Sequence, residues 1–234
     1  MLLAELDYHG HVTPRRESPM VIYGSSLSPF VRKTLAYVAE KGLKVDLKPI
    51  GLGNADPDFV ACSPFRKMPA FRDGDFAISD SSAIITYLEA KFPEPVLIPT
   101  EAKSRARTIW FEEFADTILA ACLGKMFFNR IVAPRFLGRE GDLAVAEKAQ
   151  KDEMPPLIDY IEGVLPDSGF LVDDRVTLAD LAVASPFVNL LHMGIALDAG
   201  QHPKTASFVA RLHNRASYAP LIAKETAFFN RKAS

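Results

Sequence analysis

Three serines crowd one short stretch of the chain, YGSSLSPFVRK, where an apolar run ends and a helical pattern begins. Ser28 directly precedes Pro29, and serine followed by proline is the preferred pairing of a helix N-cap with the first helical residue. A hydroxyl also has a proton to donate, and a helix N-terminus favours a bound anion. Two interpretations of Ser28 therefore stay open, a cap and an anion donor, and they are compatible.

A second polar cluster, SDSSA, also stands at the expected start of a helix. Asp80 and Ser81 are residue types that cap helices, and the same types can hold a charged ligand at a helix terminus. Between the two clusters lies RKMPAF, with Lys67 as its cationic group. For this lysine the competing interpretation is a solvated loop residue.

Composition excludes several classes of protein. The 234 residues carry 27 basic and 29 acidic side chains, so no large field attracts nucleic acid or an anionic membrane. Cys62 and Cys122 stand sixty positions apart, outside any metal-ligand spacing, so we expect neither a disulfide framework nor a metal site. No apolar run approaches the roughly 18 to 20 residues that span a bilayer, so we expect no membrane span. His9 and His11 fall in a polar extension, residues 1–19.

The elements that must position these clusters alternate between strand and helix in the first half. The pattern predicts a βαβ unit, then a β-hairpin with a type I′ turn at Asp73-Gly74, then a helix. The ranges concerned are 20–24, 29–41, 44–50, 69–79 and 80–92. This order predicts a small mixed sheet with helices packed on it.

Three prolines in seven residues mark a linker near 93–104, and the pattern beyond it is helical. We expect further helices to begin near Asp142, at Thr177, near Pro203 and near Ala219. Thr177 and Asp180 form a capping box, and Pro186 should kink or end the helix that follows. Trp110, Phe114, Ile118 and Ala121 predict the buried face of a long helix.

Four segments in this order resemble the cytosolic glutathione S-transferase superfamily, in particular its bacterial-type, serine-class members: SLSPFVRKTL, FRKMPAF, ISDSSAIITYL and VTLADLAVAS. The resemblance covers about residues 20–230. It implies a fold of class α/β plus all-α, with a thioredoxin-like N-terminal domain (βαβ-ββα) at 20–93 and an all-helical domain at 104–230. It also implies a homodimer in the cytoplasm, with no nucleic-acid or membrane partner.

The resemblance implies that glutathione is the co-substrate and that Ser28 contacts its sulfur, with Ser25 as the rival. The thiol has a pKa of about 8.5. A hydrogen bond to a charged group contributes roughly 1.5–3 kcal/mol, enough to lower that pKa by about one to two units. Serine, unlike cysteine, forms no mixed disulfide, so conjugation or isomerisation is favoured over disulfide reduction.

The resemblance also implies the residues that bind glutathione, which are Ser25, Phe30, Lys67, Met68, Pro69, Asp80 and Ser81. A cis Met68-Pro69 bond would turn the Met68 backbone toward the cysteinyl part. Asp80 and Ser81 would hold the γ-glutamyl group, and Lys67 would face a carboxylate. Many relatives have glutamate where Asp80 stands. A small electrophile would lie between the domains, near the helix around residues 111–128.

The predicted function is therefore a detoxifying glutathione S-transferase that conjugates a small hydrophobic electrophile. Two alternatives stay open. The first is a glutathione-dependent isomerase, dehalogenase or peroxidase. The second is a regulatory or assembly protein that keeps this fold without catalysis.

Overall fold

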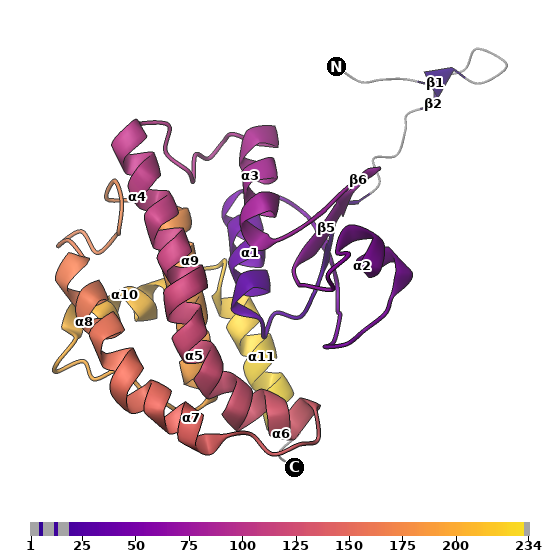
Figure 1. Ribbon diagram of the computed structural model, residues 1–234. Helices are drawn as coiled ribbons and strands as arrows, with labels where there is room; N and C mark the ends of the chain where they lie inside the picture. The colour runs from indigo at the N-terminus through magenta and orange to yellow at the C-terminus, as the bar shows by residue number, and fades with distance from the viewer. Residues whose placement is uncertain (1–4, 7–11, 14–18, 232–234) are drawn as a thin grey trace.

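The computed structural model of the chain describes residues 5–6, 12–13 and 19–231. A small sheet with its helices is followed by an entirely helical part, and α1 and α3 lie between the sheet and the remaining helices (Figure 1). The predicted fold class, a thioredoxin-like domain followed by an all-helical domain, is confirmed. The domain boundaries 20–93 and 104–230 stay predictions.

The sheet has four strands in the order β4-β3-β5-β6. β3 is parallel to β4 and antiparallel to β5, and β5 is antiparallel to β6. The predicted βαβ unit and hairpin are thus confirmed. The strands are β3 (Val21–Tyr23), β4 (Asp46–Lys48), β5 (Ala70–Asp73) and β6 (Phe76–Ser79).

Helices cover both faces of this sheet. Neighbouring residues of a strand point to opposite faces, so each strand contributes side chains to the packing on both sides. Ile22 and Phe71 belong to the large core shared with α1 (Pro29–Glu40) and α3 (Ser81–Lys91). Tyr23 and Ala70 belong to a smaller cluster with Phe59 of α2 (Pro57–Cys62). The short strands can therefore hold α1 and α3, whose first residues carry both polar clusters.

The turn of the hairpin differs from the prediction. Asp73 pairs with Phe76, so the two loop residues are Gly74 and Asp75. Of these only Gly74 has positive φ, 61°. A type I′ turn needs positive φ at both central residues, whereas a type II′ turn needs glycine only at the first, so the I′ assignment was wrong.

The helical part begins with one long helix from Ala102 to Phe136. Two segments of this helix have the wider turns of a π-helix. Its segments are α4 (Ala102–Glu113), η1 (Phe114–Leu119), α5 (Ala120–Phe127), η2 (Phe128–Val132) and α6 (Ala133–Phe136). Four further helices begin where predicted: α7 (Leu143–Lys148), α9 (Leu178–His192), α10 (Pro203–His213) and α11 (Ala219–Arg231). Two segments that were not predicted separately, η3 (Ala149–Glu153) and α8 (Met154–Val164), follow α7.

The predicted buried face of the long helix was right only at Phe114, which is 4% exposed; Ala121 is exposed. Trp110 is 51% exposed and Ile118 is 42% exposed. The buried row lies one residue further along, at Phe111, Ala115 and Leu119. Apolar residues occupy two adjacent rows of this helix, so periodicity alone did not identify the row that packs in the core.

α9 runs through Pro186 to His192, so the helix does not end at this proline; the alternative prediction, a kink, stays a prediction. Almost every residue of this helix is buried, and neighbouring side chains serve the backbone just before the proline. Tyr218 donates to the Leu181 carbonyl (2.5 Å), Arg32 donates to the Ser185 carbonyl (2.8 Å), and His213 Nε2 lies 3.0 Å from the Ala184 oxygen. Surrounding contacts therefore hold the helix together where proline weakens it.

The capping box at the start of α9 is confirmed. The Asp180 carboxylate accepts hydrogen bonds from the Thr177 backbone N–H (2.8 Å) and hydroxyl (3.0 Å). Burial raises the pKa of Asp180 to about 6, although the hydrogen bonds to Leu171 and Thr177 oppose that rise. This acid serves the fold and lies apart from the polar clusters.

The N-terminal extension is described only at two short antiparallel strands, β1 (Glu5–Leu6) and β2 (Val12–Thr13). His9 and His11 lie outside the described residues. No group of three metal-binding side chains occurs in the described ranges. The stretch Ala102–Phe136 is long and apolar enough to cross a membrane by length and composition, and 44% of its apolar window is buried within the protein. A core helix of a globular protein passes the same test.

Candidate functional site

The serine loop joins β3 to α1 and passes close over that helix. Gly24 has φ of +155°, and a Cβ at this position would lie 2.6 Å from Val31 Cγ2. Only glycine fits so close an approach. The loop then brings Ser25, Ser26 and Ser28 to the N-terminus of α1.

Ser28 occupies the N-cap position, but its side chain makes no capping hydrogen bond. Its backbone carbonyl accepts from the Arg32 N–H at 2.9 Å, as an N-cap residue should. The interpretation of Ser28 as a side-chain cap was therefore wrong, although Ser28 does occupy the N-cap position before Pro29. The hydroxyl of Ser28 stays available beside the helix N-terminus.

Ser25, the rival residue, is placed differently. Its hydroxyl oxygen lies 3.4 Å from the Leu27 N–H, which is a long hydrogen bond within the loop. The hydroxyls of Ser25 and Ser28 thus come from one short loop.

The second cluster lies at the N-terminus of α3, and there the side-chain cap is present. Asp80 Oδ1 accepts from the backbone N–H groups of Ser82 (2.9 Å) and Ala83 (3.1 Å). One carboxylate oxygen serves both bonds, so Oδ2 remains for another donor. Asp80 has φ of 87°, a conformation that costs a non-glycine residue free energy and is common at functional sites.

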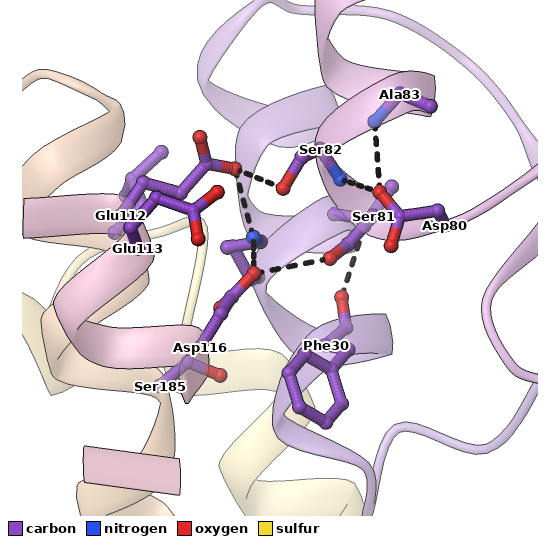
Figure 2. A network of polar contacts seen from close by, with 12 residues as sticks. Phe30, Asp80, Ser81, Ser82, Ala83, Glu112, Glu113, Asp116 and Ser185 are labelled. Atoms are coloured by element: carbon purple, nitrogen blue, oxygen red, sulfur yellow. Dashed lines mark hydrogen bonds and ion pairs between the residues drawn. The ribbon is translucent and has the colours of Figure 1, made fainter. Parts of the chain in front are cut away.

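The RKMPAF loop connects the two clusters. The Met68-Pro69 bond is cis, as the resemblance implied, and the Pro69 carbonyl accepts from the Asp80 N–H at 3.1 Å. Lys67 is exposed, and its ammonium forms no ion pair with the described residues. Phe30 is half-buried, with its carbonyl accepting from the Thr34 hydroxyl at 2.9 Å (Figure 2).

Beneath the start of α3 lies a buried group of charges that the sequence did not predict. Lys33 of α1 donates to Glu112 (2.9 Å) and to Asp116 (2.5 Å), both from the long helix. Ser82 donates to Glu112 at 2.8 Å, and the Ser81 hydroxyl lies 3.5 Å from Asp116 Oδ2. Figure 2 shows these serines and carboxylates turned toward one another. The group ties α1, α3 and α4 together.

This group has more negative than positive charge. Burial raises the pKa of Asp116, while Lys33 acts in the opposite direction. With one lysine against Glu112 and Asp116, and Asp80 close by, the start of α3 favours a cationic ligand group. A pair of acids four residues apart is common on solvent-facing helices, so the sequence offered little signal for it.

A second buried ion pair supports the serine loop. Arg32 donates to both carboxylate oxygens of Glu225 at 3.1 and 2.9 Å, and to Asn189 at 3.0 Å. His192 Nε2 lies 2.8 Å from Glu225. Burial acts to raise the pKa of Glu225, but Arg32 and His192 outweigh it and hold that pKa below its usual range.

A cavity of about 230 Å³ adjoins the serine loop. One wall is Gly24 to Leu27 with Leu47 and Pro49, and the other is Phe136, Lys224, Glu225 and Phe228. No residue of the range 111–128 lines this cavity, so the expected electrophile site near that helix stays a prediction. The residues that form its outer wall belong to α6 and α11.

Both cysteines are buried and free. Burial raises the pKa of the Cys62 thiol, and it raises that of Cys122 to about 11. Neither thiol is activated as a nucleophile. The expectation that they are small core residues is confirmed.

A thioredoxin-like domain with a cis-proline loop and polar helix N-termini, joined to a helical domain, defines the class of this protein. The family models for the N-terminal and C-terminal domains of glutathione S-transferase match residues 22–96 and 117–216. Glutathione S-transferase 3 of Zea mays is 30% identical over 212 residues, which is 88% of this chain and 90% of that relative. The chain belongs to the glutathione S-transferase family of enzymes.

Two further similarities were found, one to a solved structure and one to a sequence. The structure of glutathione S-transferase-I bound with lactoylglutathione matches with a TM-score of 0.78 at 24% identity, covering 88% of this chain and 99% of that one. A stringent starvation protein A homolog of Coxiella burnetii is 24% identical over 182 residues, or 77% of this chain and 80% of that relative.

Proposed function

We propose that this chain binds glutathione, keeps its sulfur as a thiolate through the hydroxyl of Ser28, and transfers that sulfur to a small hydrophobic electrophile. The observation that carries the proposal is the Ser28 hydroxyl, which lies at the N-terminus of α1 and makes no capping hydrogen bond. A donor in this position adds its hydrogen bond to the field of the helix N-terminus, and both favour an anion.

The magnitudes support the role. A hydrogen bond to a charged group contributes roughly 1.5–3 kcal/mol, and the helix terminus adds about 0.3–1 kcal/mol. Since one pKa unit corresponds to about 1.4 kcal/mol, these terms together bring a thiol of pKa about 8.5 to about 7 or below. The thiol proton leaves to solvent, and the thiolate can attack without a base on the enzyme.

The rest of the tripeptide would lie across the cis-proline loop toward α3. The backbone of Met68 would pair with the cysteinyl part, as an added strand pairs with a sheet edge. Asp80 through its second oxygen, with Asp116 below it, would hold the γ-glutamyl ammonium. Ser81 and its backbone N–H would hold the adjacent carboxylate, and Lys67 would face the other carboxylate.

The electrophile would occupy the cavity beside the serine loop. For an aryl halide the sulfur forms a bond to the ring carbon, the carbon–halogen bond breaks, and the halide leaves with the bonding pair. The product is a thioether. The wall of Leu27, Phe136 and Phe228 supplies apolar contacts for such a ring.

We also propose a two-fold dimer, as is usual in this family. Phe65 is 86% exposed on the loop after α2, and Ile109 and Trp110 are exposed on α4. Large exposed apolar side chains on both domains are typical of interaction surfaces. The cytoplasm stays our predicted compartment.

Retention on immobilised glutathione, with competition by the free tripeptide, tests binding. A panel of aryl halides, epoxides, hydroperoxides and mixed disulfides tests the reaction. We expect specific retention and conjugation of an aryl halide or epoxide. Retention without turnover of any compound favours the second candidate, a regulatory or assembly protein that keeps this fold without catalysis.

A further inference from the structure

The outer wall of the cavity combines aromatic rings with positive charge. Phe136 of α6 and Phe228 of α11 stack with ring centroids 5.9 Å apart and planes inclined by 12°. Both residues line the cavity, and so does Lys224 of α11. Two nearly parallel rings beside an ammonium group form a surface for a flat aromatic molecule.

The charges on these two helices are unequal. α6 and α11 together carry Arg135, Lys224 and Arg231 as cations and Glu225 as their acid. Glu225 is buried and its two oxygens are held by Arg32. The one carboxylate of this wall is therefore already neutralised.

Lys224 is the lysine that lines the cavity. It is exposed and forms no ion pair with the described residues. On the opposite wall, the lining residues from Gly24 to Leu27 with Leu47 and Pro49 carry no charged side chain. Lys48 lies between the last two, and Asp56 and Asp58 pair with it at 3.3 Å each. The cavity as a whole thus favours an anion.

We propose that the cavity selects aromatic electrophiles that carry an anionic substituent, such as a carboxylate. The ring lies against Phe136 and Phe228, the anion faces Lys224, and the reacting carbon faces the serine loop. This inference rests on the proposed function, and it names the substrate class of that same site. Lys224 is then a specificity-determining residue.

The test compares two aryl halides of the same shape, 4-chloro-3-nitrobenzoate and its neutral amide, 4-chloro-3-nitrobenzamide. The quantity measured is the ratio of kcat/KM for the acid to kcat/KM for the amide, in wild type and in Lys224→Met. The intrinsic reactivities of the two compounds cancel when the two ratios are compared. Lys103→Met, which removes an exposed lysine of α4, is the matched control.

We expect Lys224→Met to lower this ratio by about two- to fivefold, the range of an exposed ion pair. Lys224→Glu should lower it further, and 0.5 M salt should weaken the wild-type preference because exposed charges are screened. Lys103→Met should leave the ratio unchanged. An unchanged ratio in Lys224→Met, or an equal fall in the control, overturns the inference.

Binding of the two thioether products, measured by calorimetry, gives a readout that needs no turnover. Their ratio of Kd values should change in Lys224→Met by the same factor, in favour of the neutral product. If wild type converts neither halide but the ratio of Kd values still changes between wild type and Lys224→Met, the transferase function fails and the anion preference stands. If both halides are converted and neither ratio changes, only the anion preference fails.

Discussion

Arg32 and Glu225 stand 193 positions apart in the chain, and two hydrogen bonds of 3.1 and 2.9 Å join their charged groups in the protein interior. Arg32 lies one turn after Ser28, and Glu225 lies on the helix that forms the outer wall of the cavity. The pair therefore links the serine loop to the cavity wall. Its side chains are 0% and 2% exposed.

Breaking this pair should destabilise the protein strongly, and replacing both partners should cost less than the sum of the two single replacements. Arg32→Met or Glu225→Leu leaves one buried charge unpaired, which costs about 3–5 kcal/mol. The double variant removes both charges but also the hydrogen bonds of Arg32 to Ser185 and Asn189, so we expect its loss of free energy of unfolding to be well below the sum of the two single losses. Urea unfolding measures all four proteins. A loss in the double variant that equals the sum of the two single losses would show that the two charges are not coupled.

The same pair should make stability depend on pH. The folded pKa of Glu225 lies below its ordinary value of 4.5, so the unfolded chain binds more protons than the folded one. The stability that Glu225 contributes is therefore present above pH 4.5 and is lost as the pH falls through the folded pKa. As the pH is lowered from about 6 to about 3, the urea midpoint of the Arg32→Met/Glu225→Leu variant should fall less steeply than that of wild type. An identical slope in both proteins contradicts this assignment.

Asp80 should recognise the amino group of glutathione. Asp80→Asn keeps a capping residue that tolerates positive φ, but it removes the charge. We expect about a tenfold or greater loss of glutathione affinity, the effect of a hydrogen bond to a charged group. The analogue without the γ-glutamyl amine should bind both proteins alike in calorimetry. Asp75→Asn, on the hairpin turn, is the control, and equal losses for both ligands argue against the role.

The proposed dimer gives a further prediction. Phe65→Asp places a charge on a side chain that is 86% exposed, so the folded monomer should lose little stability. If Phe65 lies in the dimer interface, sedimentation should show a shift from dimer to monomer at low micromolar concentration. A variant that stays dimeric, with unchanged affinity between subunits, places the interface elsewhere.

Much of the fold could be predicted because local patterns and tertiary packing agree. The βαβ unit, the hairpin and the cap at Thr177 each follow from residues close in sequence. The errors arose where packing decides between equal local choices. Trp110 and Phe111 are neighbouring apolar residues on α4, a helix that packs against α9, and only Phe111 is buried.

The site was predicted in part. Its helix N-termini carry recognisable residues, such as Ser28 and Asp80. Lys33, Glu112 and Arg32 could not be predicted, since a charged residue in a helical pattern is usually solvent-exposed. Their partners come from distant segments, and no pattern within one helix reveals such a pairing.

The most direct measurement is the pH at which bound glutathione forms its thiolate, followed by ultraviolet absorbance in wild type, Ser28→Ala and Ser25→Ala. If Ser28 donates to the sulfur, Ser28→Ala should raise that pKa by about one to two units, while the Kd for glutathione changes little. Ser25→Ala should leave it near the wild-type value. An unchanged pKa in Ser28→Ala, with a raised pKa in Ser25→Ala, would contradict the assignment of Ser28.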